Sequence, residues 1–74
     1  MRTRVIWWIR DGPATLEGYD YVPGHISKEM AEQLLDEATA RVGADVHTLP
    51  RFCAAYYGCD DAEDWGIASV EEGE

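Results

Sequence analysis

The chain has 74 residues and a formal net charge of −9, from 15 acidic residues against six basic ones. We expect residues 1–74 to form one small domain, with no room for a cofactor domain beside a substrate domain. Acidity of this size argues against direct binding to nucleic acid or to an anionic membrane, and it suits a basic partner.

Hydropathy and cysteine usage predict a cytoplasmic protein. The apolar run Val5–Ile9 is too short for a membrane span or for the hydrophobic part of a signal peptide. Two cysteines, Cys53 and Cys59, are too few for a disulfide scaffold.

The first element is a predicted strand over Arg2–Arg10, which is rich in β-branched and aromatic residues. A strand with two apolar faces is central in its sheet or covered twice. We therefore expect a second cover over Ile6 and Trp8, from residues 52–57 or from another chain. The two faces carry Val5, Trp7 and Ile9 on one side, and Ile6 and Trp8 on the other.

A turn signal at residues 11–13 leads to a second predicted strand over Ala14–Val22, antiparallel to the first. Gly18 and Asp20 are unusual inside a strand, so we expect a twisted or bulged edge strand. One of its faces carries Thr15, Glu17, Tyr19 and Tyr21.

The clearest period in the chain predicts an amphipathic helix over Ser27–Gly43. Ser27 suits the N-cap and Gly43 the left-handed position after the last turn. The apolar residues follow the spacing i, i+3, i+4, i+7 and i+11. They are Ala31, Leu34, Leu35, Ala38 and Val42.

Opposite that stripe lie Glu29, Glu32 and Asp36, which we call the acidic ridge. They fall within an arc of roughly 60° and rise along the helix axis by about 4.5 and 6 Å. These spacings are of the order found between backbone phosphates. The alternative interpretation is an ordinary solvated helix face.

The remainder of the chain is harder to assign. Ala44–Leu49 is a candidate third strand, and Arg51–Gly58 fits a strand or, slightly better, a short helix opened by Pro50. Residues 60–63 fit a capping box for one helical turn, and Glu71 onward is a candidate for disorder. We therefore predict an α+β domain: an antiparallel sheet of two or three strands on one amphipathic helix, followed by an acidic C-terminal segment.

Motifs for metal binding and catalysis are weak. Cys53 and Cys59 are six residues apart, and His47 lies six residues before Cys53. Structural zinc sites favour more closely spaced pairs and four ligands. The acidic C-terminal segment matches a calcium loop at three positions, but Trp65 stands where an oxygen ligand is needed. His25 and His47 have no nucleophile motif beside them. We expect no metal, no cofactor and no enzymatic activity.

Aromatic residues exceed what a small core needs, and Tyr and Trp are enriched at interfaces. The alternative is that these side chains simply fill the hydrophobic core. We predict the acidic ridge and the mixed acidic and aromatic stretch after it as partner-binding. The residues are Glu29, Glu32, Asp36, Tyr56, Tyr57, Asp60, Asp61, Glu63, Asp64 and Trp65.

In size and charge the chain resembles small acidic phage inhibitors, the anti-CRISPR and anti-restriction proteins that imitate nucleic acid. The resemblance rests on the acidic ridge, residues 60–65 and Glu71–Glu72, and these proteins share no common motif. It implies an inhibitor in the host cytoplasm that binds a basic nucleic-acid-binding protein or complex of the host and blocks access of DNA or RNA.

Basic residues limit such imitation to one face, because Arg2, Arg4 and Arg10 concentrate at the N-terminal strand. The rival interpretation is a small protein–protein interaction module, such as an antitoxin or adaptor. In that case the charge serves solubility and the chain acts through its aromatic surface, with a homodimer as one form.

Overall fold

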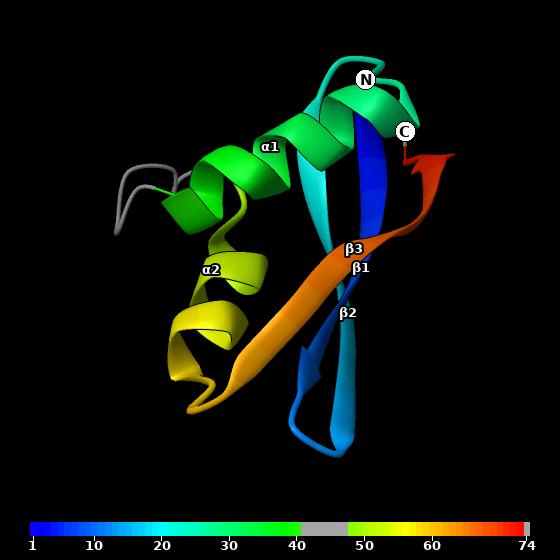
Figure 1. Cartoon of the computed structure of the whole chain (residues 1–74). Helices are drawn as coiled ribbons and strands as arrows, with labels where there is room; N and C mark the ends of the chain where they lie inside the picture. Colours follow the sequence, from blue (N-terminus) through cyan, green and yellow to red (C-terminus); the bar gives the residue numbers. More distant parts are fainter. Residues whose placement is uncertain (41–47, 74) are drawn as a thin grey trace.

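The computed structural model describes residues 1–40 and 48–73, which form a three-stranded sheet and two helices (Figure 1). The sheet is antiparallel in the order β2-β1-β3, so the first strand is central. The predicted α+β class is confirmed. The elements in chain order are β1 (Arg2–Asp11), β2 (Ala14–Pro23), α1 (Lys28–Ala40), α2 (Pro50–Gly58) and β3 (Ala62–Glu72).

The hairpin β1–β2 has the predicted pairing. Its register runs from Arg2 opposite Pro23 to Asp11 opposite Ala14, which leaves a two-residue turn. Gly12 in that turn has a φ of 59°, a left-handed conformation that glycine adopts without steric strain.

Helix α1 begins where the sequence predicts. The Ser27 hydroxyl accepts a hydrogen bond from the backbone N–H of Met30 at 3.2 Å, which confirms it as the cap. Ala31, Leu35 and Ala38 are buried, as the apolar stripe requires. The predicted end at Gly43 lies outside the described residues.

The stretch that fits either a helix or a strand is the helix α2, with Pro50 in its first turn. The candidate third strand over Ala44–Leu49 is not confirmed. Residues 44–47 lie outside the described residues, and Thr48 and Leu49 form a turn before α2.

The C-terminal prediction is wrong. Residues 60–63 do not form a helical turn and Glu71 is not disordered, because β3 extends over Ala62–Glu72. Its register against β1 shifts twice, and the shifts leave Glu63 and Ala68 as extra residues. The inward residues of β3 are consequently spaced by three, two and three positions, which hides the strand period of two. They are Ala62, Trp65, Ile67 and Val70.

The core lies between the two helices and one face of the sheet. Val5 and Ile9 are 0% exposed, and they pack with Leu35 of α1 and Phe52 of α2. Because both helices contribute to this one cluster, they cover the same side of the sheet, as Figure 1 also shows. We call this side the helix face.

The other side of the sheet, which we call the open face, is covered by no helix among the described residues. Ile6 and Trp8 of β1 lie there and are half-buried. The predicted cover from residues 52–57 is wrong, because Phe52 packs edge-on against Trp7 on the helix face, with ring centroids 5.4 Å apart. The open face also carries Arg4, Arg10, Glu17, Tyr19, Tyr21, Asp64, Gly66, Ser69 and Glu71.

Candidate functional site

The acidic ridge borders a pocket between α1 and β3. Glu32 and Asp36 line this pocket from α1, together with Leu35, and the strand side is formed by Trp65 and Gly66. Its volume is about 70 Å³, enough for one small group. We call it the acidic pocket. Glu29 lies one turn earlier on α1 and is exposed.

Trp65 is held in place by a chain of aromatic rings that begins in the core. Its ring meets Tyr56 edge-on at 5.3 Å, and Tyr56 stacks on Phe52 at 5.9 Å. Phe52 is fully buried against Trp7, so this chain of rings anchors Trp65 to the core. The indole of Trp65 therefore forms a well-supported wall of the pocket. Tyr56 is partly buried and links Trp65 to the core, and its predicted role in partner binding stays a prediction.

Tyr57 ties the two helices together. Its hydroxyl donates a hydrogen bond to the backbone oxygen of Ala38 at 2.6 Å, although 41% of the residue is exposed. Partial burial, with smaller contributions from Cys53 and Tyr56, raises the pKa of Tyr57. The phenol is therefore protonated at neutral pH and remains a donor.

The predicted acidic stretch is not one surface. Asp61 is joined to the β1–β2 turn: the backbone N–H of Gly12 donates to its backbone oxygen at 3.2 Å, and its own N–H donates to Asp11 Oδ1 at 3.1 Å. Asp60 precedes it in the same exposed loop. Glu63 occupies a bulge, and Asp64 lies opposite Arg10 on the open face. Of the ten predicted residues, Glu32, Asp36 and Trp65 line the acidic pocket together.

The cysteines are thiols rather than a disulfide. Burial, and next the neighbouring Asp11 carboxylate, raise the pKa of the Cys59 thiol, so it is protonated at neutral pH and a poor nucleophile. Within residues 1–40 and 48–73, no three His, Cys, Asp or Glu side chains converge as a metal site would require.

Sequence reasoning missed the role of Asp20, a buried carboxylate on the inward side of β2. It accepts three hydrogen bonds: from Trp7 Nε1 at 3.1 Å, from the N–H of Arg51 at 3.0 Å and from that of Phe52 at 2.8 Å. The N-cap residue of α2, Leu49, makes no side-chain cap, so Asp20 caps this helix from another strand. The sequence signal that could have indicated this role was an acidic residue inside a stretch that otherwise reads as a strand.

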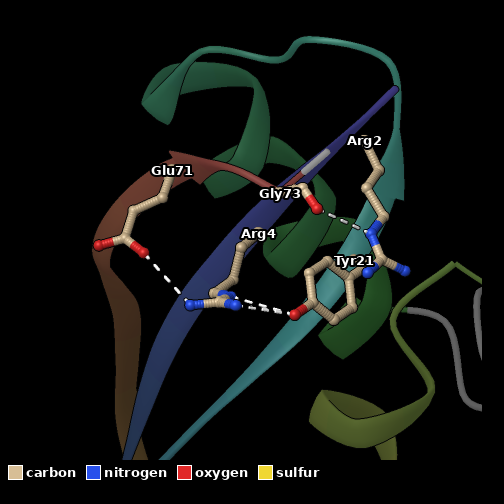
Figure 2. Close-up of polar contacts among 5 residues, drawn as sticks. All are labelled: Arg2, Arg4, Tyr21, Glu71 and Gly73. Carbon is tan, nitrogen blue, oxygen red and sulfur yellow. Dashed lines mark hydrogen bonds and ion pairs between the residues drawn. The ribbon is translucent and has the colours of Figure 1, made fainter.

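Sequence reasoning also missed a network of arginines and tyrosines at the open face, of which Figure 2 shows Arg2, Arg4 and Tyr21. The Arg2 guanidinium lies 3.7 Å from the Tyr21 ring centroid. Arg4 Nη2 donates to the Tyr21 hydroxyl at 2.9 Å, and Arg4 Nη1 is 3.6 Å from Glu71. On the neighbouring ring, Arg51 lies 4.6 Å from the centroid of Tyr19. The two tyrosines share a strand face, as predicted, but the strand register was needed to bring Arg2 and Arg4 to Tyr21, and Arg51 reaches Tyr19 from α2.

No protein-family model, curated protein or solved structure has a significant match to the chain. Among the helices in the described residues, none has the length and apolar character that crossing a membrane requires.

Proposed function

We propose that the chain is a non-enzymatic inhibitor that binds a basic, nucleic-acid-binding surface of a host defence complex and blocks access of DNA or RNA. The observation that supports this best is the acidic pocket, in which Glu32 and Asp36 of one helix lie beside the indole of Trp65. The helix backbone that carries these carboxylates is folded before binding, so binding costs less conformational entropy than it would for a flexible acidic tail.

The distribution of charge argues against the open face as the acidic surface. On the open face, the arginines at positions 4 and 10 are accompanied by Glu17, Asp64 and Glu71, so that face is nearly neutral. Most of the net charge of −9 therefore lies elsewhere in the chain. A groove that normally holds phosphates releases its counterions when such a polyanionic surface fills it.

The pocket itself suits a single basic side chain of the partner. A guanidinium group there would meet carboxylates from Glu32 and Asp36, and its plane could stack on Trp65. Arginine is the usual ligand of phosphates in such grooves, because its planar fork matches their geometry. Binding would thus occupy residues that nucleic acid needs.

The test compares two double charge reversals that change the net charge equally. E32K/D36K alters the acidic pocket, and E17K/E71K alters the open face. Asp11 is unsuitable as a control because it accepts a hydrogen bond from Asp61. Each tagged protein is used to capture host proteins, which are eluted with rising salt and then challenged with DNA and RNA.

We expect wild type and E17K/E71K to retain a nucleic-acid-binding protein that added nucleic acid displaces. E32K/D36K should lose most of this binding and show a smaller salt dependence. If both variants lose partner binding equally, the binding depends only on long-range attraction to the net charge. Retention by E32K/D36K would contradict the proposal.

The second candidate is a protein–protein adaptor that acts through the open face. It is favoured by the half-buried Ile6 and Trp8 and by Tyr19, which is 37% exposed. Binding through these residues would resist salt and would not compete with nucleic acid, which separates it from the acidic mechanism.

A further inference from the structure

The open face has an apolar centre inside a ring of charges. Ile6 and Trp8 belong to the central strand, and charged residues of all three strands surround them. A Cβ at Gly66 would lie 2.9 Å from the Trp8 indole, so the glycine lets this ring lie close against β3. An apolar centre with a polar rim is the usual composition of a protein–protein interface.

The charges of this face are complementary to themselves. One end carries Arg4 beside Glu71, and the other carries Arg10 opposite Asp64, with Glu17 opposite Trp8. Most surfaces of a chain with a net charge of −9 repel a second copy. Because both ends of the open face carry both signs, two copies related by a two-fold axis would bring opposite charges together.

Nucleic acid suits this face less well. Tyr21 already has the Arg2 guanidinium at 3.7 Å from its ring centroid, and Tyr19 has that of Arg51 at 4.6 Å. The rings are therefore partly occupied as stacking platforms for bases. The carboxylates of the rim would also repel phosphates, whereas a second copy supplies arginines to pair with them.

We propose that two copies of the chain associate through their open faces, sheet against sheet. Face-to-face sheets pack about 10 Å apart, with side chains interleaved between them. Ile6 and Trp8 would thereby gain the cover that a doubly apolar strand requires. Helix α1 lies on the opposite side of each sheet, so both acidic pockets stay exposed in the dimer, and the inference does not rest on the proposed function.

The test is the mass of the chain in solution, measured by sedimentation equilibrium from about 1 μM to about 1 mM, a range that covers weak and moderate affinities. We expect the wild type to approach twice its 8.3 kDa as the concentration rises. Ile6→Glu should raise the dissociation constant about tenfold or more, because it places a charge in the apolar centre.

Met30→Glu is the matched control, since Met30 is 52% exposed on α1, and it should dimerise like the wild type. If Ile6→Glu does not fold, Tyr19→Glu on the edge strand tests the same face. A wild type that stays at 8.3 kDa throughout would overturn the proposal, as would equal weakening by Met30→Glu. A monomer whose Trp8 emission is quenched by oligo(dT) would assign the face to nucleic acid instead.

Discussion

The two faces of β1 come from one apolar stretch but have different surroundings. On the helix face, Val5 and Ile9 are 0% exposed and Trp7 is 4% exposed. On the open face, Ile6 and Trp8 are half-buried and have charged neighbours. An apolar strand thus indicates that burial is favourable on both faces of the sheet. The connections between the elements decide which face the helices cover. Here β2, α1, α2 and β3 follow one another so that both helices pack on the same side.

The largest difference between the faces should appear when an aromatic ring is truncated. Phe52 is 0% exposed and packs on Trp7, so Phe52→Ala should lower the free energy of unfolding by about 3–5 kcal/mol through lost burial and a cavity. Tyr19→Ala on the open face should change it by about 1 kcal/mol or less. Urea denaturation measures both, and equal losses would mean that the open face is as tightly packed as the core.

Substituting alanine for one glycine on each face should give an intermediate difference in stability between the faces. An added Cβ would lie 2.6 Å from Trp7 at Gly18, on the helix face, and 2.9 Å from Trp8 at Gly66, on the open face. The Trp7 ring is enclosed and bonded to Asp20, so Gly18→Ala should destabilise by about 1–3 kcal/mol. The Trp8 ring can shift toward solvent in the monomer, so Gly66→Ala should destabilise less. A larger effect at Gly66 in thermal melts of the monomer would contradict this difference.

The smallest effect should come from the ion pair on the open face. The side chains of Arg4 and Glu71 are 42% and 52% exposed, so water and salt screen their attraction. Glu71→Gln should lower the melting temperature by about 1 °C or less at low salt. At high salt the difference should vanish, and a decrease that persists there would show that the pair is shielded from solvent.

Local signals in the sequence were sufficient for much of the fold. The hairpin followed from β-branched residues around a turn, and α1 from its period and its Ser27 cap. For α2, Pro50 and Gly58 only favoured a helix slightly over a strand. The strand β3 was missed because the bulges at Glu63 and Ala68 disturb its alternation, so its acidic residues suggested a helical turn and a tail.

The candidate site depended more on tertiary structure. The acidic ridge followed from helical spacing, but its position beside Trp65 depends on how β3 pairs with β1. The open-face network needed the register of three strands, and the role of Asp20 depends on amides 31 and 32 residues further along the chain. No local pattern contains such contacts.

The cap that Asp20 provides has a consequence for the order in which the chain folds. Helix α1 has 13 residues and its own cap, so it can begin to form from local contacts alone. Helix α2 has nine residues, too few to be stable in isolation, and its first amides bind a carboxylate from β2. Its formation therefore waits until the hairpin is in place and Asp20 and Arg51, which are 31 residues apart in the chain, have come together. In the folded protein, local opening of the hairpin would likewise release α2, so the two should exchange their amide hydrogens as one cooperative unit.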